Sequence, residues 1–156
     1  MAPMTQLKAR LQSDLTEAIR ARSEVTVATL RMALSAITTE EVAGRTARTL
    51  TDDQVTAVLT REAKKRREAA TAFRDAGRTD LADREDAELA VLAGYLPEPL
   101  SAEQVSELVQ RAVTGATAAG VTGKAAMGRV MKELTPQVAG RFDGGQLAAL
   151  VRDALG

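Results

Sequence analysis

The sequence contains no cysteine, no histidine and no tryptophan, and aromatic residues make up only 2% of it. The lack of cysteine excludes disulfides and thiolate nucleophiles, and the lack of histidine removes the commonest general base of enzymes. Zinc sites of the usual type are excluded as well, because they are built from these two residues, so a metal ion would have to be held by carboxylates alone. We therefore expect no metal site and no bound cofactor.

Two further absences concern membranes and net charge. No segment approaches the roughly 20 apolar residues of a membrane-spanning helix, and the opening MAPMTQLKAR lacks a long apolar run. The sequence therefore predicts a cytoplasmic protein without membrane contact. The net charge is zero, from 21 basic and 21 acidic residues, so any attraction for nucleic acid has to come from a local group of basic residues.

What the sequence does contain is a regular helical pattern. Apolar residues amount to 45% of the 156 residues and recur every three or four positions, which predicts an all-α fold. A core of leucine, valine, alanine and methionine, almost without aromatic residues, also favours helices over sheets. Seven helices are predicted: two marked by the apolar positions Leu7–Ile19 and Val27–Ile37, and five that span about 52–76, 80–95, 102–119, 123–135 and 144–155.

The expected helix ends rest on local capping signals. Gly44 and Gly77 are predicted to end the second and third helices, because glycine adopts the left-handed conformation of a C-terminal cap most easily. Three helix starts have the pattern of a capping box, in which a side-chain oxygen and a glutamine exchange hydrogen bonds with the backbone. These are TDDQ at 51–54, SAEQ at 101–104 and DGGQ at 143–146.

The stretch YLPEPLS divides the predicted helices into two groups. Pro97 and Pro99 prevent a helix from continuing and stiffen the chain, which is typical of a joint between domains. We predict an N-terminal four-helix domain at 1–96 and a small C-terminal three-helix domain at 97–156.

A first basic segment, REAKKRREAATAFRDAGRTD, lies in the third and fourth predicted helices. Positions 61–78 contain seven basic and three acidic residues, whereas positions 79–90 contain one basic and five acidic residues. The two segments meet at Gly77–Arg78, which indicates an antiparallel helical hairpin with opposite charges on its two arms. One interpretation is a surface that compensates its own charge, and the alternative is a phosphate-binding surface.

Two other groups of charged residues invite a functional interpretation. Glu62 and Arg66, four residues apart, fall on the apolar side of their helix. This indicates a salt bridge at the boundary with neighbouring helices or, alternatively, a polar spot in a groove. The acidic run Glu85, Asp86 and Glu88 extends the charge pattern of the hairpin. Nothing in the sequence brings together a nucleophile, a base and an oxyanion donor, so no catalytic site is predicted.

A second basic segment, Val121–Gly145, is less charged but includes the start of the helix at 123–135. Thr122 is predicted to cap that helix and to leave the amides of its first turn exposed, and such a helix start attracts phosphate. Gly128 has no packing role that the sequence explains, and it permits close contact with another backbone or an RNA strand. The pattern GVTGK fails as a P-loop, because Ala125 replaces the required Ser or Thr. The two interpretations are an ordinary capped helix and a docking site for a sugar–phosphate backbone.

With these segments in place, the chain resembles the GatB/YqeY family, and specifically its free-standing YqeY-like members, over essentially its full length. The middle of the chain is the most specific part, with a basic helix, FRDAGR, an acidic helix and YLP in that order. Three stretches carry the resemblance: LRMALSAI at 30–37, REAKKRREAATAFRDAGRTDLADREDAELAVLAGYLPEPLS at 61–101 and GKAAMGRVMKELTPQVAGRFDGGQLAALVRDAL at 123–155.

The resemblance implies an all-α protein with an N-terminal helical domain and a smaller three-helix domain. The same module is similar to the tail of the B subunit of the glutamine-dependent amidotransferase that converts Glu-tRNA(Gln) or Asp-tRNA(Asn), where it helps to hold the tRNA body. Activation and glutamine hydrolysis use other parts of that enzyme. A family label of carbon–nitrogen ligase with glutamine as amido donor therefore describes a related process. The implied tRNA contacts are Lys124, Gly128, Arg129, Lys132 and Arg141, with Lys64, Lys65 and Arg67 as a second set.

Three hypotheses for the function follow. The first is a non-catalytic tRNA-binding module that recognises phosphates and shape, since aromatic stacking platforms are missing. The second is a helical adaptor that binds another cytoplasmic protein, and the third is an amidotransferase-like ligase. A salt-sensitive affinity for RNA distinguishes the first from the second, and turnover of ATP or glutamine by the purified chain would support the third.

Overall fold

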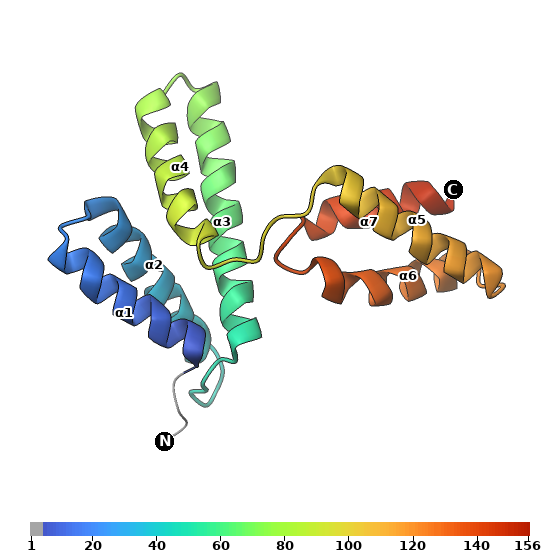
Figure 1. The fold of residues 1–156 in the computed structure, drawn as a ribbon, viewed down its shortest axis with the longest axis horizontal. Helices are drawn as coiled ribbons and strands as arrows, with labels where there is room; N and C mark the ends of the chain where they lie inside the picture. The colour runs from blue at the N-terminus through green and yellow to red at the C-terminus, as the bar shows by residue number, and fades with distance from the viewer. Residues whose placement is uncertain (1–4) are drawn as a thin grey trace. The chain divides into compact units, whose positions relative to one another are not determined.

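A computed structural model describes residues 5–156, in which helices are connected by turns and loops and no strand occurs. Residues 1–4 of the predicted N-terminal domain lie outside the described residues. The prediction of an all-α fold is confirmed. Figure 1 shows the helices in chain order: α1 (Gln6–Arg20), α2 (Glu24–Glu41), α3 (Asp52–Asp75), α4 (Thr79–Ala93), α5 (Ala102–Ala118), α6 (Gly123–Val138) and α7 (Gly144–Leu155).

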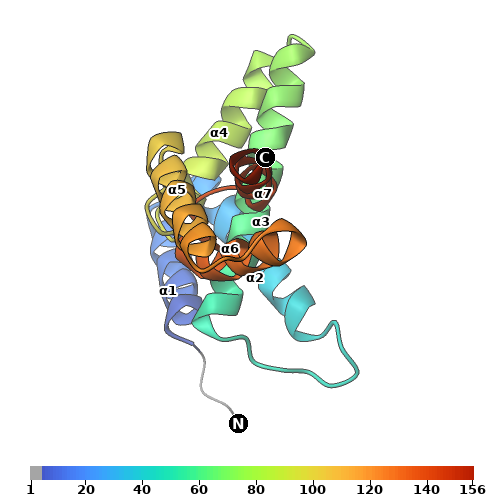
Figure 2. The same ribbon diagram turned by 90° about the vertical axis from the view of Figure 1, so that its right-hand side faces the viewer.

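The helices group into two compact units, one that ends at Leu96 and one that begins at Pro97. The first contains α1–α4 and the second contains α5–α7. Within the first unit, α3 and α4 lie side by side as an antiparallel pair (Figure 2), and α1 and α2 pack against each other and against α3. Within the second unit, each of the three helices contacts the other two.

Each unit has its own core of aliphatic side chains. Fully burying one such side chain contributes about 1.5–3 kcal/mol, so each core fixes which face of every helix turns inward. The first core includes Leu11, Leu30, Ile37, Leu59 and Leu92, which come from all four of its helices. The second core includes Val105, Val130, Leu134, Leu147 and Val151, from α5, α6 and α7.

Two of the three predicted capping boxes are complete. The amide of Gln54 donates to Oγ1 of Thr51 at 3.2 Å, and the amide of Thr51 donates to Oε1 of Gln54 at 2.9 Å. Ser101 and the glutamine three residues after it form the same pair of bonds. At α7 only half of the box is present, because Oδ1 of Asp143 accepts the amide of Gln146 at 2.9 Å but the glutamine side chain does not reach back.

The turn between α3 and α4 has the predicted form. Gly77 follows α3 with a φ of 76°, which is the left-handed conformation that favours glycine. The amide of Arg78 then donates to the carbonyl of Phe73 at 2.8 Å, which satisfies one of the last carbonyls of the helix. The predicted antiparallel hairpin of a basic and an acidic helix is therefore confirmed.

Two helix ends differ from the prediction. α2 ends at Glu41 and not at Gly44, because the carbonyl of Glu41 accepts the amide of Arg48 at 2.9 Å. The loop thus satisfies this carbonyl without a glycine turn. α6 continues past position 135 to Val138, although Pro136 lies inside it. Since Pro136 stands in the last turn, it removes a single amide donor and the helix ends soon after it.

Candidate nucleic-acid interface

The outward face of α6 carries four of the residues that the sequence predicts as RNA contacts. They are Lys124, Gly128, Arg129 and Lys132, and all four are exposed. The opposite face of the helix is buried in the core of the unit through Val130, Leu134 and Val138. Because an α-helix has 3.6 residues per turn, positions 124, 128 and 132 follow one another along the outward face, and Arg129 lies beside them. We refer to these four positions as the row on α6.

The basic side chains of this row are not neutralised by the protein itself. Within residues 5–156, no carboxylate forms an ion pair with Lys124, Arg129 or Lys132. Glu133 is the one acidic residue of α6. The chain as a whole is neutral, so this face is a local basic group of the kind that attraction for nucleic acid requires here.

The start of α6 differs from the prediction. Thr122 occupies the N-cap position, but its side chain makes no capping hydrogen bond. Gly123, the first residue of the helix, has a φ of 63°, and this geometry separates the start of α6 from that of an ordinary capped helix. The amides of the first turn therefore receive no acceptor from the side chain of Thr122, and the partial positive charge of this helix end adds to that of Lys124.

Arg141 lies apart from this face, in the loop between α6 and α7. Its Nε donates to the carbonyl of Glu98 at 3.0 Å, and its own carbonyl accepts the amide of Leu100 at 2.8 Å. Arg141 is only partly exposed. Its hydrogen bonds hold the first residues of the C-terminal unit against the α6–α7 loop, so Arg141 has a structural role that the sequence pattern did not reveal.

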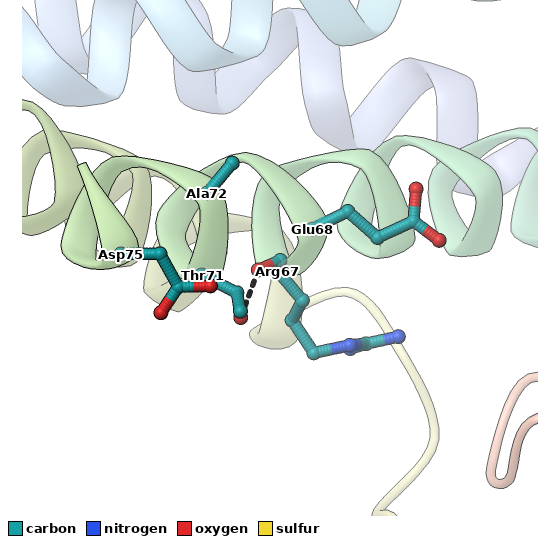
Figure 3. A pocket seen from close by; sticks show the side chains of 5 residues that line it. All are labelled: Arg67, Glu68, Thr71, Ala72 and Asp75. Carbon is teal, nitrogen blue, oxygen red and sulfur yellow. Dashed lines mark hydrogen bonds between the residues drawn. The ribbon is translucent and has the colours of Figure 1, made fainter.

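The second predicted set, Lys64, Lys65 and Arg67, lies on the exposed side of α3 in the N-terminal unit. The Nζ of Lys65 is 3.2 Å from Oε1 of Glu62. Arg67 borders a shallow hollow on this side of α3 (Figure 3), where Glu68 and Asp75 supply two negative charges. This set is therefore mixed with acidic groups, unlike the row on α6.

Most of the other basic residues of α3 are paired with carboxylates. Arg74 pairs with Asp86 of α4, and Arg61 lies 3.4 Å from Oε2 of Glu40 on α2. The pair between Arg74 and Asp86 joins the two arms of the hairpin, as a surface that compensates its own charge requires. Exposed pairs of this kind contribute little stability each, at most about 1 kcal/mol.

Arg66 lies at the centre of a mostly buried charge cluster between α3 and α4. Its guanidinium is 3.1 Å from Glu88, 3.5 Å from Glu62 and 3.7 Å from Glu85, and 13% of its side chain is exposed. Burial, followed by the charge of Glu88, raises the pKa of Glu85. The predicted boundary salt bridge between Glu62 and Arg66 is confirmed, but the sequence did not indicate that Glu85 and Glu88 join it. That depends on how α4 packs against α3.

The part of the chain that the structure describes offers neither a membrane-spanning helix nor a carboxylate metal site. None of its helices is both long and apolar enough to cross a membrane. The same residues include no group of three or more carboxylates arranged to hold a metal ion. The exposed row on α6 is thus the candidate site that the geometry distinguishes most clearly.

One protein family matches most of the chain, and two known proteins are similar to large parts of it. A family described as "Yqey-like protein" matches residues 8–155. The protein of Pyrenophora tritici-repentis (strain Pt-1C-BFP) named "Altered inheritance of mitochondria protein 41, mitochondrial" is 32% identical over 136 residues, which is 85% of this chain and 71% of that protein. "Uncharacterized protein C22F3.15" of Schizosaccharomyces pombe (strain 972 / ATCC 24843) is 34% identical over 96 residues, 61% of this chain and 76% of that protein.

Proposed function

The chain belongs to the YqeY-like protein family, as its motifs predict, and we propose that it is a non-catalytic module that binds tRNA through the outward face of α6. The observation that carries the proposal is the row of exposed basic residues without ion-pair partners among residues 5–156, in a chain whose net charge is zero. Phosphate groups are the chemical partners that such a row attracts.

The side chains of this face fit a backbone ligand better than a base. Lys124 and Lys132 act as point charges toward phosphates, and the guanidinium of Arg129 is able to donate two hydrogen bonds to one phosphate. No aromatic residue occurs in α6, so it offers no platform for stacked bases. Recognition by this face would therefore depend on the shape and the charge of the RNA.

A link to tRNA-dependent amidation is part of the proposal and rests on the resemblance to the amidotransferase tail. The names of the two relatives mention neither tRNA nor amidation. A module without catalysis is proposed because the carboxylates of Glu85 and Glu88 are engaged with Arg66 in an ion-pair cluster. The name of the Pyrenophora relative places that protein in mitochondria, and the cytoplasmic location of this chain stays a prediction.

Binding of the purified chain to total tRNA across a salt series tests the proposal. We expect an affinity that falls as salt rises, because bound lysines and arginines release counterions from the phosphates. A triple variant with Lys124→Glu, Arg129→Glu and Lys132→Glu should lose at least about ten-fold in affinity, since it reverses every cation of the row.

The matched control reverses Lys64, Lys65 and Arg67 on α3, which changes the net charge by the same amount. This variant should bind like the wild type. Loss of binding in the control alone would move the site to α3, and no binding of the wild type at low salt would contradict the proposal in favour of the adaptor hypothesis.

A further inference from the structure

Gly128 is an exposed glycine in the interior of α6 without a structural reason inside the protein. Its backbone is helical, and a Cβ atom built on it meets nothing within 4 Å. Alanine would therefore fit at this position, and it would stabilise the helix, because interior glycine is among the least favourable helix residues. The structural argument for a glycine at this position is therefore a close approach to α6 by another molecule.

The neighbours of Gly128 indicate what approaches. Lys124 and Lys132 each lie four residues, slightly more than one helical turn, from Gly128. Their Cα positions are about 12 Å apart along the axis, from eight residues at 1.5 Å each. Both lysines are exposed, and neither has an ion-pair partner within residues 5–156. The exposed backbone at Gly128 thus lies between two positive charges that no carboxylate among residues 5–156 neutralises.

We propose that the backbone of a paired RNA stem crosses α6 at Gly128, and that the missing side chain lets ribose 2′-hydroxyls reach the helix backbone. This inference rests on the proposed function and adds the class of RNA and the residue that selects it. Lys124 and Lys132 hold phosphates on either side of the crossing point. Gly128 is then a specificity-determining residue, which favours RNA over DNA.

The hydrogen-bonding capacity of the helix supports a contact with a hydroxyl group. In an α-helix the carbonyl of Lys124 accepts the amide of Gly128, but a carbonyl oxygen has two lone pairs and one of them stays available. A side chain covers the turn that precedes its own Cα, so a residue with a Cβ at position 128 would shield this turn. A 2′-hydroxyl is a donor that DNA lacks, and the shallow minor groove of paired RNA displays it.

The same face argues against other partners. Single strands bind proteins mainly by stacking their bases on aromatic rings, and α6 has no aromatic residue. A protein helix that crossed closely at Gly128 would need acidic residues on both sides of the crossing to match Lys124 and Lys132. A nucleic-acid backbone presents negative charge along its whole length, so it meets this requirement without a special sequence.

The test compares Gly128→Ala with Gly115→Ala in the full-length chain. Gly115 is also an exposed helical glycine, in the last turn of α5, and its Cβ would also meet nothing within 4 Å, so it serves as the control. Both substitutions should raise the melting temperature by about 5 °C, because alanine is a better helix former than glycine. The probes are an RNA hairpin stem and a DNA hairpin of the same sequence, and binding is measured by fluorescence anisotropy.

The wild type and Gly115→Ala should bind the RNA stem more tightly than the DNA stem. Gly128→Ala should bind RNA about five-fold more weakly, the effect of losing about one hydrogen bond, and should bind DNA with unchanged affinity. The stabilised variant would then be the weaker binder, which a purely structural role of Gly128 does not produce.

Equal binding of RNA and DNA stems by the wild type would overturn the inference, and so would unchanged RNA binding by Gly128→Ala. If tRNA binding were still lost on reversal of Lys124, Arg129 and Lys132, the proposed function would stand without this refinement. Failure of the wild type to bind tRNA or either stem would contradict both the proposed function and the inference about Gly128. Preferential binding of an acidic helical peptide, weakened by Gly128→Ala, would assign the crossing to a protein partner and overturn the inference.

Discussion

The hydroxyl of Tyr95 donates a 2.6 Å hydrogen bond to Oδ2 of Asp14 and thereby joins the segment after α4 to α1. Arg10 completes the contact, because its guanidinium lies 4.6 Å from the centre of the Tyr95 ring and donates to the carbonyl of Gly94 at 3.3 Å. Burial, followed by the hydrogen bond to Asp14, raises the pKa of Tyr95 to about 12. This contact fixes the last residues of the N-terminal unit to its first helix.

Tyr95→Phe should lower the free energy of unfolding at pH 7 by about 1 kcal/mol, since it removes one hydrogen bond while the ring stays in place. The raised pKa adds a pH dependence. The stabilisation is complete below the ordinary tyrosine pKa of 10.0 and is lost as the pH rises toward 12, because the ionised form is disfavoured in the folded state. Urea unfolding of both proteins measures this difference.

Tyr95 is the one tyrosine of the chain, and there is no tryptophan, so the ultraviolet absorbance of tyrosinate reports its ionisation directly. A titration midpoint of the folded protein at the ordinary value of 10.0 would contradict the burial and the bond to Asp14.

Glu85→Gln should stabilise the protein at neutral pH. Burial and the charge of Glu88 raise the pKa of Glu85, so the ionised carboxylate is disfavoured in the folded state. The wild type therefore gains stability as the pH falls through this raised pKa, and its difference from Glu85→Gln should vanish below the ordinary value of 4.5. Unfolding by urea from pH 7 to pH 4 gives the comparison. Glu68→Gln, an exposed position of the same hairpin, controls for the change in net charge, and equal effects of the two substitutions would refute the prediction.

Arg66→Ala should be strongly destabilising, by about 3–5 kcal/mol, because it leaves the mostly buried Glu62 and Glu88 without their shared partner. Arg61→Ala is the matched control on the same helix. The Arg61 side chain is 60% exposed and pairs with Glu40 among the described residues, so its loss should cost less than about 1 kcal/mol. Similar midpoints of chemical denaturation for the two variants would show that the cluster does not hold α3 against α4.

Thr51→Ala should lower the free energy of unfolding by about 1 kcal/mol, because it removes the capping acceptor of α3. Thr122→Ala should have almost no effect, since the side chain of Thr122 makes no capping bond at the start of α6. The two substitutions are chemically identical and both fall at N-cap positions, so thermal unfolding compares them directly. A larger loss for Thr122→Ala would mean that this residue caps α6 in solution.

The fold was predictable to the extent that it depends on neighbours in the sequence. The complete capping boxes at Thr51 and Ser101 and the left-handed turn at Gly77 involve residues a few positions apart, and the sequence predicted all three correctly. The predictions failed at Gly44 and Thr122. α2 ends before Gly44, where the amide of Arg48 donates to the carbonyl of Glu41, and α6 starts without a hydrogen bond from the Thr122 side chain.

For the candidate site, the sequence by itself determined the helix of Lys124 and Lys132 and the face that its apolar residues bury, because both follow from helical periodicity. Only the tertiary structure decided that no carboxylate comes within ion-pair distance of these lysines among residues 5–156. It likewise decided that Arg141 holds Glu98 and that Glu88 is buried beside Arg66. These contacts join different parts of the chain, and a periodic pattern carries no information about which side chains meet once the helices have packed.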